Sequence, residues 1–454
     1  MAGIGFELKK IINDGSITSF LKASFSGIFI VAGPWMFSIV TLSSISYLVQ
    51  DLKRESIDDF FSILIYIFSF SIIISGGFQY LITRLFSDYI YNKKVNEALY
   101  FIEMYMLITG IISFIITFIL SYLFIGLDNG TYILFLLIAL ASSSVNILWI
   151  IIIFATYLKW FLHIALSFVL GIGFIVLNLI INKNPSLNFI LFIYGIGNFI
   201  TIFCLYLISH HSYKPKKIYL YSILDIIKRN IDGLNFLFLT GLFYYLYIWI
   251  DKILYWIYKG SSVGKLDLNL YLDYDLALYI ANLTLIPGLV FFVIVSETDF
   301  FIYMKKFLLS LQHSDYRTIK EKMVKLGKTT NRVIISQFSN QLLITISVLL
   351  FVISYTSYSR VILTVSFVAV YFQLIIFSYL NFLFYMERYR ETFKICSALF
   401  ILNLVLTWLV IKLNINIPGL SYLITNIIGT IFSISIFNKS IIRLDRYIYM
   451  QNSK

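Results

Sequence analysis

Long uncharged stretches of Ile, Leu, Phe and Val recur along the whole chain and constrain its fold more than any other feature. Each is about as long as the roughly 20 residues that a helix needs to cross the hydrocarbon core of a bilayer. Lipid offers no partner for backbone N–H and C=O groups, so each stretch is expected to be an α-helix. The twelve stretches lie at approximately 23–48, 60–83, 99–125, 131–156, 160–181, 187–209, 233–258, 276–298, 333–357, 361–386, 392–412 and 416–437.

The composition supports a polytopic membrane protein. The chain is 60% hydrophobic and 13% charged, whereas a soluble domain carries about 25% charged residues. A soluble chain this apolar could not cover its surface with polar groups. No connection is long enough for a separate soluble domain. The charged segment 1–22 precedes a full span and has no cleavage-like pattern, so it is not expected to be a signal peptide.

The basic residues predict the orientation in the membrane. With the N-terminus in the cytoplasm, the inner segments hold 27 of the 35 Lys and Arg residues and the outer segments hold 8. Because basic residues favour the cytoplasmic side, both termini are expected there. We attribute the positive charge to topology and to anionic lipid, and no nucleic-acid motif supports binding of a nucleic acid.

Neither cysteine nor histidine suggests a reactive centre. Cys204 and Cys396 each lie inside a span and are expected to be buried free thiols. The four histidines are scattered, and His163 is expected to be a core residue. We therefore expect no catalytic residues, no metal site and no cofactor.

The spans divide into two halves of six, offset by roughly 210 residues. In each half the second span is followed by an amphipathic inner stretch, at 85–99 and at 303–328. An even number of spans per half makes the repeat parallel, which is a feature of transporters that carry substrate between their halves. The predicted divisions are a cytoplasmic segment 1–22, a six-helix bundle 23–210, a basic linker 211–232, a second bundle 233–438 and a cytoplasmic tail 439–454.

Two prolines lie in the middle of spans. Pro34 is in the first and Pro287 in the eighth. Each removes a backbone donor and is expected to kink its helix. Such kinks either allow movement beside a cavity or only assist packing, and the sequence favours neither.

Several stretches resemble one family. They are MAGIGFELKKII at the start, AGPW (32–35), GGFQYLITRLFSDYIYNKK (76–94), WIDKILYW (249–256), YDLALYIANLTLIPGLVFFVIVSETDFF (274–301) and FQLIIFSYLNFLFYMERYRETF (372–393). In this order they are similar to the Pel exopolysaccharide transporter family (PelG), of the multidrug/oligosaccharidyl-lipid/polysaccharide flippase superfamily.

The resemblance implies a fold and a function. The fold is twelve helices in two bundles around a central cavity. The function is export of a polysaccharide of partly deacetylated N-acetylhexosamines across the bacterial cytoplasmic membrane. A cytosolic glycosyltransferase would make the polymer from nucleotide sugar, and small membrane proteins would link the two. The transporter itself would perform no chemistry.

Asp251 and Lys252 interrupt the seventh span with two charges. At 1.5 Å per residue, Asp251 lies roughly 27 Å along the span, in its outer part. An unpaired charge at depth costs on the order of 3 kcal/mol, so a position facing the bundle interior or a water path is favoured. Adjacent side chains point about 100° apart and need not pair. Asp251 could bind sugar hydroxyls, balance an amino sugar or take part in proton coupling. Lys252 could instead snorkel to the outer headgroups.

Aromatic residues surround these charges. Tyr245, Trp249, Lys252 and Trp256 recur at helical spacing on one face. Aromatic rings can lie against the C–H faces of sugars, while Tyr and Trp keep a polar handle. Such a face suits a sliding polysaccharide, although an interfacial belt with helix packing explains the same residues equally well.

Charged residues at the inner ends of three spans are candidates for a cytoplasmic gate, which would break as the halves tilt. The alternative is a set of surface anchors or ion pairs, each contributing under about 1 kcal/mol. The candidates are Arg84, Asp88, Glu297, Asp299, Glu387 and Arg388.

The 303–328 stretch is the best candidate for a partner site. It combines an apolar stripe with Lys320, Lys322, Lys325 and Lys328. Lying on the anionic inner leaflet is its simplest interpretation, and docking of the glycosyltransferase is compatible with it.

Other functions remain open. A lipid-linked oligosaccharide flippase or a drug/cation antiporter would use the same fold. A membrane glycosyltransferase is less well supported. The acids of 51–60 stand where some such enzymes place catalytic ones, but those enzymes usually carry a sizeable outer domain.

Overall fold

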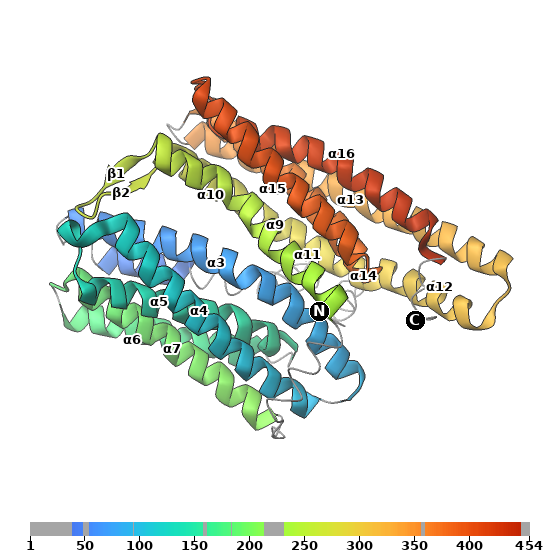
Figure 1. Ribbon diagram of the computed structural model, residues 1–454, viewed down its shortest axis with the longest axis horizontal. Coiled ribbons are helices and arrows are strands. Elements are labelled where there is room, and N and C mark those ends of the chain that lie inside the picture. Colours follow the sequence, from blue (N-terminus) through green and yellow to red (C-terminus); the bar gives the residue numbers. More distant parts are fainter. Residues whose placement is uncertain are drawn as a thin grey trace. The chain divides into compact units, whose positions relative to one another are not determined.

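The computed structural model describes residues 39–48, 54–93, 95–157, 161–182, 184–212, 231–355 and 359–445. These residues are almost entirely helical (Figure 1). The first helices are α3 (Arg54–Tyr91), α4 (Val95–Asn129), α5 (Tyr132–Tyr157), α6 (Phe161–Ile181), α7 (Leu187–Ser212) and α9 (Ile231–Tyr258). A hairpin of β1 (Ser261–Val263) and β2 (Leu268–Leu270) follows. The remaining elements are α10 (Leu272–Leu283), α11 (Leu285–Val295), the π-helix η1 (Ser296–Phe300), α12 (Phe301–His313), α13 (Tyr316–Tyr355), α14 (Arg360–Tyr385), α15 (Tyr389–Lys412) and α16 (Leu420–Ile442).

Eleven helical stretches among the described residues are long and apolar enough to cross a membrane. They coincide with the last eleven predicted spans, so the chain is a multi-pass helical membrane protein. Of the first predicted span, the described part is the apolar helix Ile39–Leu48. The rest of that span, including Pro34, lies outside the described residues. The count of twelve, the six-helix repeat and the side of the termini stay predictions.

The described residues form two compact units, which meet in sequence between Tyr271 and Leu272. We call the described residues 39–271 the first unit and the described residues 272–445 the second unit. The first unit contains α9, which packs against α3. Close approach is possible because Gly76 and Gly241 face each other: a Cβ on Gly241 would overlap the carbonyl oxygen of Gly76. The predicted bundle boundaries stay a prediction.

The core of the first unit is apolar, with a polar ladder inside it. Buried Ile63, Phe135 and Tyr194 belong to a large hydrophobic cluster. Between α4 and α5, Asn146 donates to Ser113 (2.6 Å), and the Ser113 and Ser142 hydroxyls are 2.9 Å apart. Hydrogen bonds of this kind hold helices together where lipid supplies no hydrophobic driving force.

The second unit is built around α14. This helix is buried on most of its surface and packs against α10, α13 and α16. The outer helices expose large apolar side chains, such as Leu350 on α13 and Ile401 on α15. These exposed groups are what a bilayer requires of the surface that it contacts.

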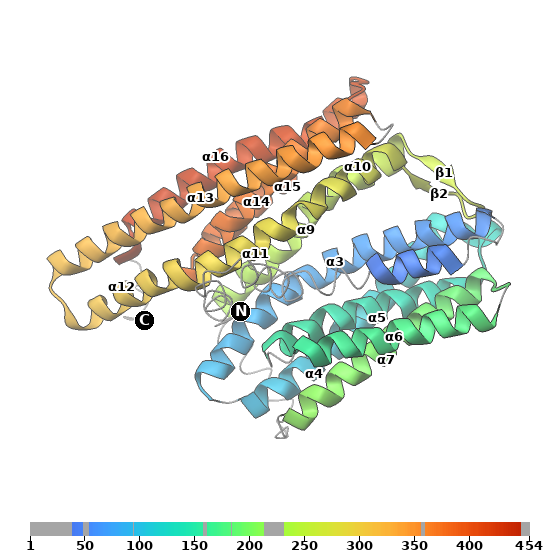
Figure 2. The same ribbon diagram turned by 180° about the vertical axis from the view of Figure 1, so that it is seen from behind.

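Residues 303–328 do not form one amphipathic helix. α12 ends at His313, the chain turns at residues 314–315, and α13 returns antiparallel beside α12. In both views this pair extends beyond the ends of α14, α15 and α16 (Figures 1 and 2). The sequence shows the amphipathic pattern, and Ser314–Asp315, a turn and helix N-cap signal, is the mark of the turn that divides it.

Candidate functional site

Asp251 and Lys252 lie together on α9 and are both buried. Their side chains are 0% and 6% exposed, and Lys252 Nζ lies 3.9 Å from Asp251 Oδ1. Two adjacent residues reach each other here because the lysine side chain is long and folds back along the helix. The pair places two opposite charges in a site that water does not reach from outside the chain.

Lys252 does not snorkel toward the outer surface. Its ammonium group donates to the carbonyl oxygen of Ile248 (2.7 Å), one turn earlier on α9. It also lies 4.6 Å from the centre of the Trp249 ring, an arrangement that stabilises a cation by about 2 kcal/mol when water is excluded. These contacts, together with Asp251, explain why the charge stays inside.

The two tryptophans of α9 form a cluster with α3. Trp256 is 2% exposed and stacks on Tyr66, with ring centres 4.7 Å apart. Trp249 lies 6.2 Å from Trp256. Tyr66, which the sequence analysis did not single out, is in turn 5.6 Å from Phe124 of α4. The spacing of aromatics on α9 could not reveal partners that come from two other helices.

Tyr245 lies on the same side of α9, one turn before Trp249. Its ring lies directly against Gly76, so a Cβ there would overlap it. Its hydroxyl is 3.4 Å from Gln79 Oε1 of α3, and Gln79 Nε2 donates to Ser75 (3.0 Å). Two members of the predicted face, Tyr245 and Trp256, therefore carry contacts from α9 to α3, while the contacts of Trp249 and Lys252 described above are within α9.

A buried carboxylate fastens the hairpin to the end of α3. Asp59 is 4% exposed and accepts from the backbone N–H groups of Lys265 (2.7 Å) and Leu266 (3.0 Å). Gly264 has φ +75°, and a Cβ at this position would overlap Asp59. The carboxylate thus holds the turn between β1 and β2, which follows α9 directly. Sequence reasoning grouped Asp59 with possible catalytic acids, because nothing in the sequence pairs it with a turn that lies so far along the chain.

The first two gate candidates form an ion pair on α3. Arg84 Nη2 lies 3.3 Å from Asp88 Oδ1, and both side chains are at least one third exposed. An exposed pair of this type contributes under about 1 kcal/mol. Both residues belong to the first unit.

The other gate candidates belong to the second unit. Glu297 and Asp299 lie in the π-helical turn η1, a type of turn that is frequent at functional sites. Glu387 has φ +56°. Arg388 is 7% exposed and donates to the carbonyl oxygen of Arg443 (3.2 Å). It therefore stabilises the carbonyl end of α16, where a cation is favoured. The role of these residues as a gate stays a prediction.

The helix around Pro287 is interrupted. α10 ends at Leu283 and α11 begins at Leu285. Gln341 of α13 donates to the carbonyl oxygen of Thr284 at the interruption (3.0 Å). Its side chain fills the space beside Gly288, where a Cβ would overlap it. The interruption is thus supported by a polar side chain from a neighbouring helix.

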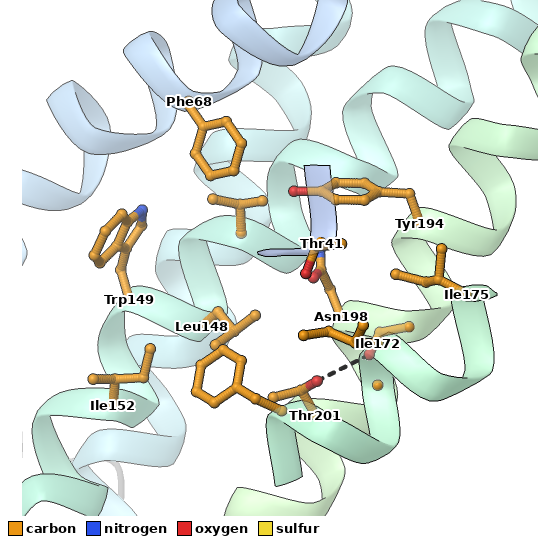
Figure 3. A pocket seen from close by; sticks show the side chains of 14 residues that line it. Thr41, Phe68, Leu148, Trp149, Ile152, Ile172, Ile175, Tyr194, Asn198 and Thr201 are labelled. Atoms are coloured by element: carbon orange, nitrogen blue, oxygen red, sulfur yellow. Dashed lines mark hydrogen bonds between the residues drawn. The ribbon is translucent and has the colours of Figure 1, made fainter. Parts of the chain in front are cut away.

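A small cavity lies inside the first unit, among α3, α5, α6, α7 and the 39–48 helix (Figure 3). Its volume is about 40 Å³, enough for one or two water molecules, which need at least about 10–15 Å³ each. Thr41, Trp149, Tyr194 and Asn198 bring uncharged polar groups to its wall. The indole N–H of Trp149 has no hydrogen-bond partner among the described residues. The cavity suits water and is too small for a sugar.

Metal-binding chemistry has no support in the described part of the chain. Within those ranges, no group of three or more His, Cys, Asp or Glu side chains is arranged to hold a metal ion. Cys204 and Cys396 are free thiols.

Solved structures with the same fold are transporters. One is a transporter of the MOP superfamily from Pyrococcus furiosus; the match has 13% identity and a TM-score of 0.57, and covers 93% of this chain and 95% of that one. A MATE transporter in a bent conformation has 13% identity, a TM-score of 0.58 and coverage of 98% and 99%. An outward-facing multidrug resistance MATE transporter has 11% identity, a TM-score of 0.56 and coverage of 92% and 96%. At these identities the likeness shows the fold. No curated protein matches the chain significantly.

The family is shown by sequence. The family model of PelG, described as an exopolysaccharide exporter (EPS-E), matches residues 1–449. Family and fold together indicate a transporter rather than an enzyme. The chain belongs to the PelG family of exopolysaccharide exporters, on a fold of the MOP flippase superfamily.

Proposed function

We propose that this chain exports a Pel-type polysaccharide of partly deacetylated N-acetylhexosamines across the bacterial cytoplasmic membrane. A cytosolic glycosyltransferase makes the polymer, and small membrane proteins of the same system connect it to the transporter. The observation that carries the proposal is the outer part of α9, where the buried Asp251–Lys252 pair adjoins Trp249 and Trp256.

The chemistry of this site fits an amino-sugar polymer. Asp251 is closed off in this structure, where it balances the Lys252 ammonium. Once movement of the helices opens this side of α9, its carboxylate accepts hydrogen bonds from sugar hydroxyls or balances a deacetylated amine. Trp249 is only partly buried, so part of its ring is available to a sugar face. Stacking on aromatic rings tolerates movement of the ligand, which a sliding polymer requires.

Movement of the helices completes the mechanism. The interrupted helix at Pro287 and the π-helical turn η1 are the points at which the second unit bends. By its place in the sequence, Pro34 is assigned the same role in the first predicted span. The charged residues that open and close the cytoplasmic gate are Arg84, Asp88, Glu297, Asp299, Glu387 and Arg388.

The test uses inside-out membrane vesicles that contain this chain and its glycosyltransferase partners. Labelled nucleotide sugar is supplied outside, and the polymer that becomes protected from an added glycoside hydrolase is measured. We expect protection that requires this chain, and an uncoupler then tests proton coupling. Polymer that is made in full but stays digestible in tight vesicles would contradict the proposal.

The site is tested with tryptophan variants in the same assay. Trp249→Ala with Trp256→Ala is expected to slow export. The control is Trp408→Ala on α15, because Trp408 is 44% exposed and has a lysine, Lys412, 4.7 Å from its ring. Equal yields from both variants would assign the α9 tryptophans to packing alone.

A second candidate is favoured by the structural neighbours, which include multidrug MATE transporters. On that alternative the chain is a drug/cation antiporter or a lipid-linked oligosaccharide flippase. Inside-out vesicles that accumulate an organic cation in exchange for protons, without any glycosyltransferase, would support the antiporter. A neighbouring gene for a soluble glycosyltransferase favours the exporter.

A further inference from the structure

The α12–α13 hairpin is longer than the membrane allows. α13 has 40 residues and is therefore about 60 Å long, twice the roughly 30 Å of the hydrocarbon core. Gly327 of α13 lies beside Ile441, at the last turn of α16. At 1.5 Å per residue, residues 316–326 thus extend about 16 Å beyond the end of α16. Figures 1 and 2 show the hairpin projecting past that end.

This projection takes the tip of the hairpin beyond the lipid headgroups: Tyr316 and Lys320 lie about 16 Å and about 10 Å past Gly327, whereas Val324, about 4–5 Å past it, lies at headgroup level. The headgroup region adds only about 5–8 Å on each side of the core. A straight helix cannot turn through a right angle to lie on the surface, and α13 is continuous from Tyr316 to Tyr355. The expectation from sequence that 303–328 lies on the inner leaflet therefore does not fit its geometry.

The hairpin has its own core. Met304 and Phe307 of α12 are buried, as are Ile319, Met323 and Leu326 of α13. Asp315 caps the start of α13 and accepts from the Thr318 hydroxyl (2.6 Å). The two helices of the hairpin therefore pack on each other and leave a defined outer surface.

That outer surface carries exposed apolar groups. Leu308, Leu309, Tyr316 and Val324 are 41%, 50%, 57% and 52% exposed. Tyr316 and Val324 share one face of α13 with Lys320, because the three recur every four residues. Lys320 Nζ lies 5.1 Å from the Tyr316 ring. Exposed apolar side chains with a charged rim are typical of a surface that binds another protein.

The charge of the hairpin defines the partner. Residues 301–328 carry seven Lys and Arg side chains against two acidic ones, Asp315 and Glu321. Three other segments predicted to be on the inner side, 1–22, 213–230 and 446–454, are each net positive as well. Like charges disfavour these segments as occupants, so an acidic surface from another protein is the complement.

We propose that the α12–α13 hairpin docks a soluble protein with an acidic surface and an apolar centre, namely the glycosyltransferase that delivers the polymer. This inference rests on the proposed function, which supplies the identity of the partner, and it adds a direct contact to the connection that the small membrane proteins provide. It adds the surface at which delivery occurs: Leu308 of α12 and Tyr316, Lys320 and Val324 of α13.

The experiment measures binding rather than export. The full-length chain is placed in nanodiscs of phosphatidylcholine, and the probe is the purified cytosolic glycosyltransferase of the same organism's Pel-type system. We expect Lys320→Glu with Val324→Ser to weaken binding at least tenfold. The matched control is Lys439→Glu with Ile442→Ser on α16, which are exposed side chains off the hairpin, and it is expected to change binding less than twofold. Added salt is expected to weaken the wild-type complex.

The outcomes separate this inference from the proposed function. No binding to the wild-type chain, or equal binding by the hairpin and control variants, would overturn the docking surface even if vesicles export polymer. Binding that requires phosphatidylglycerol in the disc and is unchanged by the hairpin substitutions would identify lipid as the contact. That result would also overturn the docking surface. Hairpin-dependent binding without export in the vesicle assay would support docking and contradict the proposed function.

Discussion

Neutralising one member of the Asp251–Lys252 pair is expected to destabilise the protein much more than neutralising both. At 3.9 Å and an effective dielectric constant of about 20, the attraction is about 4 kcal/mol. Removing one partner of a buried pair typically costs about 3–5 kcal/mol, because the other charge stays buried. In Asp251→Asn, Lys252 keeps its contacts with Ile248 and Trp249. We therefore expect this variant to lower the free energy of unfolding by about 3 kcal/mol, the lower end of that range.

The double variant separates pairing from other effects. In Asp251→Asn with Lys252→Met neither charge remains, and replacing a buried pair by neutral groups is often close to neutral. The expected coupling energy between the two positions is at least about 2 kcal/mol. The assay is equilibrium unfolding of the purified protein in mixed micelles, followed by tryptophan fluorescence. Lys412→Met, which removes the exposed ammonium near Trp408, is the control and is expected to change stability by under about 1 kcal/mol.

Additive behaviour would refute this reasoning. If the losses in unfolding free energy of the two single variants add up to the loss of the double variant within about 0.5 kcal/mol, the two charges do not stabilise each other. The same proteins then report on export. A double variant that folds normally but exports nothing would indicate that the charged pair takes part in export, whereas normal export would limit the pair to a structural role.

Three further changes test other parts of the structure. Asp59→Ala removes a charged acceptor of two backbone N–H groups and is expected to destabilise the protein by about 2–4 kcal/mol, with faster hydrogen exchange in residues 261–270. Gly241→Ala forces α9 away from α3 and is expected to lower the free energy of unfolding by about 1–3 kcal/mol, whereas Gly173→Ala, which meets open space, should not lower it. The hydrogen bond from Thr318 holds the pKa of Asp315 below its usual value. The stability that the Asp315 carboxylate adds to the folded state is therefore fully present above its unfolded pKa of about 3.9. It is lost as the pH falls through the lower pKa of the folded state. Hydrogen exchange in the first turn of α13 should accelerate in that range, and Asp315→Asn should abolish the pH dependence.

The sequence predicted the spans well because lipid removes most alternatives. A long apolar stretch in a bilayer has only the helix available, so eleven spans follow from composition with small errors at their ends. The errors fall where helices continue into water. α13 starts at Tyr316 rather than near 333, because Lys and Arg end an apolar stretch without ending a helix.

The candidate site was predicted only in part, because its contacts join distant positions. The sequence identifies the aromatic face of α9 but not Tyr66 or Gly76, on which that face packs. It identifies Pro287 but not Gln341, which hydrogen bonds at the interrupted helix. It also allows Lys252 to reach either outward to the headgroups or back along the helix, and only the positions of Trp249 and Ile248 decide between them.

These contacts change what a loss of export would mean. The aromatic face of α9 packs on α3, with Tyr245 against Gly76 and Trp256 against Tyr66, so the residues proposed to meet the polymer also hold two helices together. A single alanine at these positions removes buried area and a possible sugar contact at once. Trp249 is the exception, because it is only partly buried and its ring centre is 6.2 Å from that of Trp256. If the polymer slides along α9, Trp249→Ala should therefore reduce export more than stability, while Trp256→Ala should reduce both. If the ratio of export loss to stability loss is the same in Trp249→Ala as in Trp256→Ala, the face serves packing alone.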